Sequence, residues 1–304
     1  CVYVQFDPSL FPSSECRLCY RIALAVLDIR NWASDMVDRD DPLLIEQIQA
    51  RLLPRRGIFA NPDEIIVTLG AQNALYMLAT LLMGKGSRVA MEEPGYPDAR
   101  SIFNLAGAET VPVPVDGSGI VTDRIPSDAG FVFVTPSHHC PTMVSLSEAR
   151  RQDLLDRANR HNQIIGYIVA SAGLISELRA LRRFMLRHPP ANNQRAVALF
   201  LSLGHHEALV RRLSSAFEER RKRLEQAVSA FLPEWHAPHP AGGTSVWLEG
   251  PRGINVRDLA AAAASRSVII EPGDRYFGHA DKPSRFVRLG ISSIALQHFV
   301  AGSR

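Results

Sequence analysis

Lysine is scarce in this sequence. Of the 34 basic residues among 304, only Lys85, Lys222 and Lys282 are lysines, and arginine supplies the other 31. The formal net charge of +3 is too small to predict nucleic-acid binding from charge alone. No apolar run approaches the roughly 20 residues that a membrane helix needs, so we expect no membrane contact. The 46% hydrophobic and 21% charged residues are typical of a soluble globular protein.

Cysteine is also rare, with four residues in all. So few cysteines do not make a disulfide framework in a chain of this length, and they favour a reducing, cytoplasmic location. Cys16 and Cys19 have zinc-ligand spacing, but the sequence has no second pair to complete a tetrahedral site. We therefore expect both on a helix face, and we expect no metal site. The chain begins at Cys1 with neither a methionine nor a leader, and we expect further residues upstream.

Strand and helix patterns alternate through the first half of the chain. Asp41 and Pro42 provide a helix N-cap and a first helical residue, and Gly57 is the expected stop. Further along, strands are expected at 63–70, 87–93, 108–115 and 130–137, and helices at 71–83, 97–107 and 146–162. This alternation predicts a mainly parallel, doubly wound sheet.

The second half has a different pattern. A long helix over 207–231, with His205 and His206 at its start, has an arginine-rich face that we interpret as solvated rather than as a nucleic-acid site. Strands at 242–251, 267–277 and 285–292 surround a helix at 255–266. We therefore expect a small α+β domain over 206–304, a large domain over 31–205, and an N-terminal segment, 1–30, packed on the small domain.

Three motifs lie where strands meet helices or turns. Gly70, Ala71 and Gln72 join a strand to a helix start, where backbone N–H groups and the helix dipole suit a phosphate. Tyr96 lies in a Pro–Gly turn after the next strand, where its ring can stack on a flat ligand or simply pack in the turn. The segment TPSHHCPT at 135–142 follows a third strand, at the edge of the sheet where ligands bind. Each motif alone is a weak signal, whereas their order and spacing are specific.

Together the motifs resemble those of fold type I proteins that use pyridoxal phosphate (PLP). More narrowly, they resemble the aminotransferase-like domain of MocR-type regulators in the GntR group. The similar segments cover nearly the whole chain: FDPSLFP, RRGI, IIVTLGAQNAL, PGYP, TPSHHCPT, AGG at 241–243, PGDRYF and RLGIS. The resemblance implies an α/β fold with a mainly parallel seven-stranded sheet, a smaller α+β domain, PLP as cofactor, and a homodimer.

The resemblance also assigns roles by position. The backbone at Gly70, Ala71 and Gln72 would bind the cofactor phosphate, and Tyr96 would stack on the pyridine ring. Arg288 in RLGIS would clamp the carboxylate of a small amino-group effector with its planar fork. A strand-edge salt bridge is the alternative role for Arg288.

Two segments depart from the family pattern. In the loop that contacts the cofactor, His139, Cys140 and Met143 replace the usual glutamine, aromatic residue and glycine, and His139 stays a candidate cofactor-binding residue. The run at 32–42, WASDMVDRDDP, replaces a Tyr-Gly-Asp-Pro run that contributes to the ligand pocket. This acidic run is similar to that of regulators of ectoine use, so an ectoine-related effector is one candidate.

The resemblance further implies a lysine that forms the Schiff base with the cofactor aldehyde, and an acidic strand residue that holds the pyridinium nitrogen. None of the three lysines lies at the position that the resemblance implies. NQII, where the acidic strand begins, runs directly into GYIVAS, where the strand after the lysine resumes. A crossover between parallel strands needs about a dozen residues or more. We therefore expect several tens of residues between Ile165 and Gly166 in the encoded protein; a real deletion, the alternative, would remove central strands. No catalytic residue is assigned, and we expect PLP to be absent or unanchored without the lysine.

Three functions are compatible with these motifs. In the first, the chain is the effector-sensing domain of a transcriptional regulator whose upstream winged helix-turn-helix binds DNA. In the second, it is a PLP-dependent aminotransferase. In the third, it has lost the cofactor and binds a small amino acid or compatible solute directly. We favour the sensor because TPSHHC sides with the regulators and the chain starts without methionine.

Overall fold

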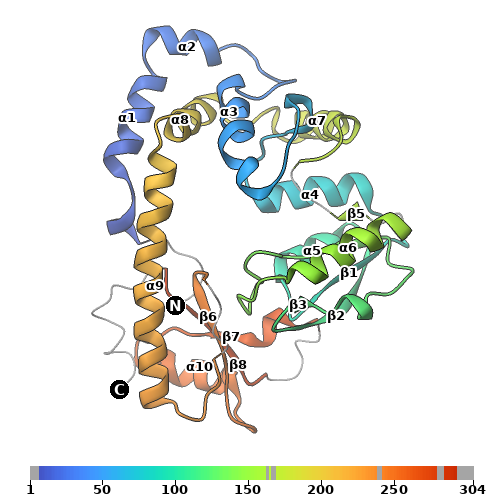
Figure 1. Ribbon diagram of the computed structural model, residues 1–304, viewed down its shortest axis with the longest axis vertical. Coiled ribbons are helices and arrows are strands. Elements are labelled where there is room, and N and C mark those ends of the chain that lie inside the picture. The colour runs from blue at the N-terminus through green and yellow to red at the C-terminus, as the bar shows by residue number, and fades with distance from the viewer. Residues whose placement is uncertain (1–6, 162–163, 166–168, 238–241, 279–283, 293–304) are drawn as a thin grey trace.

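The computed structural model describes residues 7–161, 164–165, 169–237, 242–278 and 284–292 (Figure 1). The α-helices are α1 (Ser13–Ala23), α2 (Val26–Trp32), α3 (Pro42–Gln47), α4 (Ala71–Leu82), α5 (Pro97–Leu105), α6 (Glu148–His161), α7 (Ala172–Leu186), α8 (Ala191–Ser202), α9 (His205–Phe231) and α10 (Val256–Ala264). The strands are β1 (Arg88–Glu93), β2 (Glu109–Asp116), β3 (Gly119–Ile120), β4 (Phe131–Phe133), β5 (Ile164–Ile165), β6 (Ser245–Glu249), β7 (Glu271–Pro272) and β8 (Phe286–Gly290). Within these ranges no helix is both long and apolar enough to cross a membrane.

The larger sheet has the order β3-β2-β1-β4-β5. β1 pairs in parallel with β2 and β4, and β4 pairs in parallel with β5, whereas the short β3 is antiparallel to β2. The α/β class expected from the sequence is confirmed. The described residues form five strands in this sheet, however, rather than the seven that the resemblance implied.

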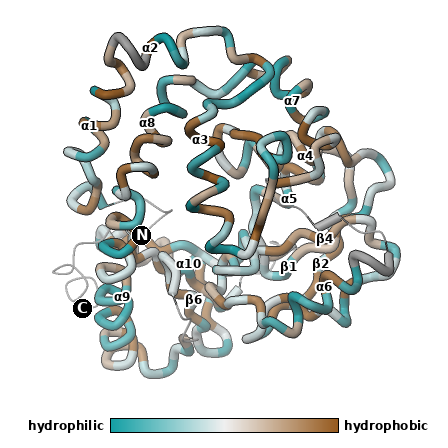
Figure 2. Tube along the Cα trace, turned by 45° about the horizontal axis from the view of Figure 1, so that its top comes forward, coloured by the Kyte–Doolittle hydropathy of each residue, from teal (hydrophilic) through white to brown (hydrophobic). Residues whose placement is uncertain are grey.

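Helices cover both faces of this sheet, because successive residues of a strand point to opposite sides. Val89 and Met91 of β1 are fully buried in a cluster with residues of α4 and α5, whereas Ala90 is buried in a second cluster with Leu154 of α6. Figure 2 shows hydrophobic residues concentrated along β1, β2 and β4. The large domain is therefore a three-layer arrangement, as expected of a parallel sheet.

The expected strand at 63–70 is not formed. Among the described residues, one isolated antiparallel bridge occurs there, between Ile65 and Val169. Side chains satisfy the backbone of this segment instead: Arg179 donates to the carbonyl of Ile65, and Arg182 donates to that of Val67.

The helix expected from Asp41 is confirmed. The Asp41 carboxylate accepts a hydrogen bond from the Leu44 N–H at 3.1 Å, and Pro42 is the first residue of α3. The helical path continues after α3 through a π-helical turn (Ile48–Leu52) and a 3-10 turn (Pro54–Arg56). It ends at Gly57, whose φ is 66°.

The smaller sheet has the order β6-β8-β7, with all pairs antiparallel. Val228 of α9 packs against Val246 and Leu248 of β6, so the long helix covers this sheet. α9 is one continuous helix that begins at His205, as expected. Much of its surface is hydrophilic in Figure 2.

The N-terminal segment contacts both parts of the molecule. α1 packs against α8, and the two lie side by side in Figure 1. The 3-10 turn Pro8–Leu10 lies against α9, where Arg212 donates to the carbonyl of Leu10 and Arg220 pairs with Asp7. The domain boundaries near residues 30 and 205 stay predictions.

Candidate functional site

Two of the sequence motifs, the Tyr96 turn and the loop at 135–142, lie at the same edge of the large sheet. β1 and β4 are parallel neighbours, so the turn after β1 and the loop after β4 both start at their carboxyl ends. The start of α4 is tied to this edge by Gln72, whose Nε2 donates to the Tyr96 hydroxyl at 3.0 Å and to Asp98 Oδ2 at 2.6 Å. The predicted phosphate site and the predicted stacking residue are therefore brought together.

The start of α4 is shaped to receive an anion. Gly70, the N-cap residue, has a φ of 107°, which only glycine adopts without strain. No side chain in the described part of the chain caps this end, and Gly70, Ala71 and Gln72 are exposed. The first N–H groups of a helix have no partner within it, so those of Ala71 and Gln72 are available to a ligand.

The loop after β4 is held by a buried carboxylate. Glu92 Oε2 accepts hydrogen bonds from the Thr135 N–H (2.9 Å) and hydroxyl (2.6 Å). His139 Nε2 lies 3.5 Å from the same oxygen, and His139 Nδ1 lies 2.6 Å from the Thr142 hydroxyl. Glu92 and His139 are 2% and 1% exposed. The loop is thereby fixed to β1, the strand that precedes the Tyr96 turn.

Burial decides the charges of this pair. It raises the pKa of Glu92 to about 7 and lowers the pKa of His139 to about 4, so both groups are neutral between these values. The pair is therefore a neutral contact rather than a salt bridge over that range. His139 uses its ring inside the protein, and a contact of that ring with a cofactor stays a prediction.

The small domain contacts the turn that contains Tyr96. The carbonyl of Tyr276, in the 3-10 turn Gly273–Tyr276, accepts from the Gly95 N–H at 2.8 Å. Glu93, at the end of β1, accepts from the Gly278 N–H and pairs with Arg100. The turn that carries Tyr96 is therefore fixed by both domains.

Arg288 lies in the middle of β8 and is buried. Its Nη1 donates to Glu271 Oε2 at 3.0 Å. The charges of Arg288 and Glu271 act on the pKa of Cys140, so the arginine lies near the loop after β4. Burial raises the pKa of the Cys140 thiol to about 11, which keeps it protonated at neutral pH. The alternative role considered for Arg288, a salt bridge, is therefore formed with Glu271, and its role as a carboxylate clamp stays a prediction.

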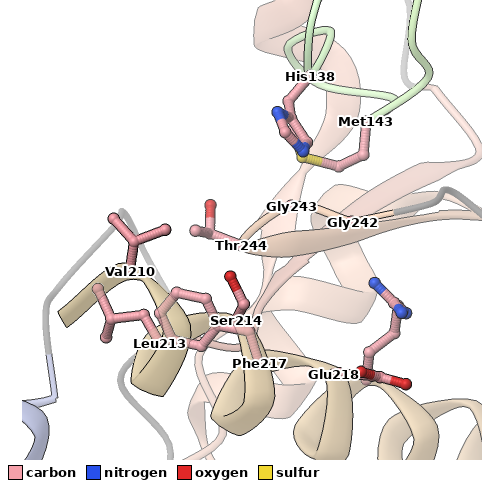
Figure 3. A pocket seen from close by; sticks show the side chains of 11 residues that line it. His138, Met143, Val210, Leu213, Ser214, Phe217, Glu218, Gly242, Gly243 and Thr244 are labelled. Carbon is pink, nitrogen blue, oxygen red and sulfur yellow. The ribbon is translucent and has the colours of Figure 1, made fainter. Parts of the chain in front are cut away.

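A cavity of about 740 Å³ adjoins the loop after β4 (Figure 3). His138 and Met143 lie on one side of it, Gly243 and Thr244 form the next wall, and the first half of α9 lies opposite. Gly243 has a φ of 99°, and a Cβ there would come within 2.6 Å of Met143 Sδ. The AGG motif therefore permits the loop to pack directly on the small domain.

The acidic run at 32–42 is used for packing. Asp40 forms a buried ion pair with Arg182, and Asp41 pairs with Arg195 at 3.0 Å. Sequence reasoning missed these pairs because their members are far apart in the chain. The scarcity of lysine was a signal, since arginine is the cation suited to buried pairs.

Comparison with known proteins identifies the class. Residues 35–165 match the family model of aminotransferase class I and II. The structure superposes on a kynurenine aminotransferase of Pyrococcus horikoshii with a TM-score of 0.89, covering 99% of this chain and 87% of that one at 19% identity. The chain therefore has the fold of the PLP-dependent, fold type I aminotransferases.

Relatives found by sequence narrow the family further. The chain is 37% identical to the HTH-type transcriptional regulator TauR of Rhodobacter capsulatus, over 96% of this chain and 70% of TauR. It is 26% identical to the HTH-type pyridoxine biosynthesis transcriptional regulator PdxR of Corynebacterium glutamicum, over 76% of this chain and 60% of PdxR. The chain belongs to the MocR-type transcriptional regulators of the GntR group and corresponds to their aminotransferase-like domain.

The same comparisons bear on the junction after Ile165. The match to the family model ends at residue 165. The TauR alignment spans 337 positions, whereas 96% of 304 residues is about 292, so about 45 positions are occupied by TauR alone. Gly166 lies outside the described residues, and the expectation of a segment between it and Ile165 stays a prediction.

Proposed function

We propose that this domain senses a small amino-group effector with the help of PLP and passes the signal to a DNA-binding head. The observation that carries the proposal is the convergence of three motifs at one sheet edge. The helix start at Gly70, the Tyr96 turn and the loop after β4 meet there, and the small domain brings Arg288 toward that loop. DNA would be bound by an upstream winged helix-turn-helix, and the domain would act as a homodimer.

The residues at this edge fit the phosphate and the ring of PLP. The uncapped, exposed start of α4 offers the N–H groups of Ala71 and Gln72 to a phosphate. Tyr96 is half-buried in a turn that both domains fix, which suits stacking on a ring. When bound, PLP supplies an aldehyde that reacts with amino groups.

The described lysines do not fit the aldehyde. Lys85 is exposed before the amino end of β1, away from the carboxyl ends where the motifs meet. Lys222 is exposed on α9 and pairs with Glu218 at 2.8 Å. The third, Lys282, lies outside the described residues. We propose that the covalent lysine belongs to the segment between Ile165 and Gly166.

The geometry suggests how the signal would travel. The Tyr96 turn contacts the large domain through Gln72 and the small domain through Tyr276. A ligand bound at this edge would shift the balance between open and closed positions of the two domains only to the extent that it prefers one of them. The N-terminal turn Pro8–Leu10 rests on α9, which belongs to the small domain, so that balance would reach the DNA-binding head.

The experiment uses the encoded full-length regulator loaded with PLP. Addition of an amino-group effector should give one stoichiometric spectral change, no released keto acid, and altered affinity for the operator. Unchanged operator affinity at saturating effector would refute the sensing role.

An aminotransferase is the second candidate function. It is favoured by the close superposition on an aminotransferase that has little sequence identity with the chain. Steady release of keto acid from an amino donor would support the enzyme and contradict a pure sensor.

A further inference from the structure

Glu271 is hydrogen-bonded to Arg288, the arginine that we assign to the effector carboxylate. Glu271 and Arg288 lie directly opposite each other on β7 and β8, so the antiparallel register brings both side chains to one face. Arg288 Nη1 donates to Glu271 Oε2 at 3.0 Å, and the two side chains are only 6% and 3% exposed. The pair is built into the sheet rather than being a surface contact.

Other donors fix Glu271 in place. Arg275 lies in the 3-10 turn that follows β7, and its Nη1 donates to the second oxygen of Glu271, Oε1, at 3.2 Å. The Tyr276 hydroxyl is also hydrogen-bonded to Glu271. A carboxylate held by three donors has little freedom to move away. Any anion bound by Arg288 therefore binds beside a fixed carboxylate.

One N–H group of the Arg288 guanidinium, that of Nε, has no hydrogen-bond partner among the described residues. This nitrogen is buried. Nε and Nη2 form one edge of the planar group, and that edge can bind an acid group through two hydrogen bonds. Because Glu271 engages Nη1, the Nε–Nη2 edge is the part left for a ligand.

We propose that Glu271 is a specificity-determining residue of the effector site. It compensates the charge of Arg288 and holds Nη1, so that the Nε–Nη2 edge accepts an amino compound with one acid group and disfavours a doubly charged acid. The cause is Coulomb repulsion between Glu271 and the ligand, which doubles when the ligand carries two negative charges. This inference rests on the proposed function, which places the effector at Arg288.

The test replaces Glu271→Gln in the encoded full-length protein. Glutamine keeps the shape and one acceptor oxygen, but removes the charge. The matched control is Glu249→Gln, which removes a carboxylate paired with Arg285 at the more exposed rim of the same sheet. Arg288→Gln identifies binding at this site.

The probes are propionate, with one carboxylate, and succinate, with two. Neither has an amino group, so their binding does not depend on a reaction with the cofactor. Dissociation constants are obtained by following the Nε–H signals of ¹⁵N-labelled arginine during NMR titrations.

The expected result is that Glu271→Gln binds succinate about tenfold more tightly than the wild type and gains less for propionate. Glu249→Gln should leave both constants unchanged, and Arg288→Gln should abolish binding. If Arg288→Gln abolishes binding but Glu271→Gln changes neither constant, the effector site stands and the role of Glu271 is wrong. If Arg288→Gln leaves the binding of both probes unchanged, the placement of the effector at Arg288 is wrong, and the inference falls with it.

Discussion

Arg182 of α7 and Asp40 form an ion pair in which neither side chain is exposed at all. Arg182 Nη1 lies 2.7 Å from Asp40 Oδ1 and also donates to the carbonyl of Val67 at 2.7 Å. The other Asp40 oxygen accepts from the Val67 N–H at 3.1 Å. The pair therefore supports the segment that leads to Gly70 and the start of α4.

Removing Arg182 should be costly. Arg182→Met leaves Asp40 buried without its cation, and we expect the free energy of unfolding to fall by about 3–5 kcal/mol. Urea denaturation measures the change. The matched control is Arg183→Met, which loses only the exposed 3.9 Å contact with Asp38 and should change the free energy by less than about 1 kcal/mol. Similar losses in the two variants would contradict the role of the buried pair.

The stability of the wild type should depend on Glu92 in a defined pH range. The pKa of this carboxyl is raised from 4.5 to about 7, so its contribution is full below pH 4.5 and is lost as the pH rises through 7. Relative to Glu92→Gln, the wild type should lose on the order of 3 kcal/mol across that range. Urea denaturation at a series of pH values gives the comparison. Parallel pH profiles for the two proteins would show that Glu92 is not perturbed.

The phosphate site can be tested without disturbing α4. Ala71→Pro removes one backbone N–H at the first helical position, where proline is well tolerated. We expect the affinity for PLP to fall about tenfold, which corresponds to one lost charge-assisted hydrogen bond, while the free energy of unfolding stays within about 1 kcal/mol of the wild type. Equilibrium dialysis gives the affinity. Unchanged affinity would exclude the Ala71 N–H as a phosphate donor.

Tyr96 should act through its ring. Tyr96→Phe loses the hydroxyl that bonds to Gln72 but keeps the ring, so we expect the affinity for PLP to change by less than about threefold. Tyr96→Ala loses the ring, and we expect a fall of about tenfold. The same dialysis measurement compares the two variants. Equal losses would indicate that the hydroxyl, not stacking, is what matters.

Local signals in the sequence predicted much of this fold. The cap at Asp41, the start of α4 after Gly70 and the long helix from His205 all follow from residues that are close in sequence. The order of the motifs also predicted that Gly70, Ala71, Gln72 and Tyr96 meet, and the Gln72–Tyr96 hydrogen bond shows that they do.

Long-range pairing could not be predicted in the same way. The segment at 63–70 has strand residues, but among the described residues its one strand-like partner is Val169, so its pattern alone was misleading. The Glu271–Arg288 contact depends on the register of β7 and β8, which the sequence does not specify. The buried contact of Glu92 with His139 depends on the parallel pairing of β1 with β4.

The account is tested most directly at the junction after Ile165. The encoded protein is incubated with PLP, reduced with borohydride, digested and analysed by mass spectrometry. We expect an intact mass above the 33.5 kDa of the present sequence, and PLP attached to a lysine in a peptide between Ile165 and Gly166. A peptide in which Ile165 is followed directly by Gly166, with no cofactor attached to any lysine, would contradict the proposal.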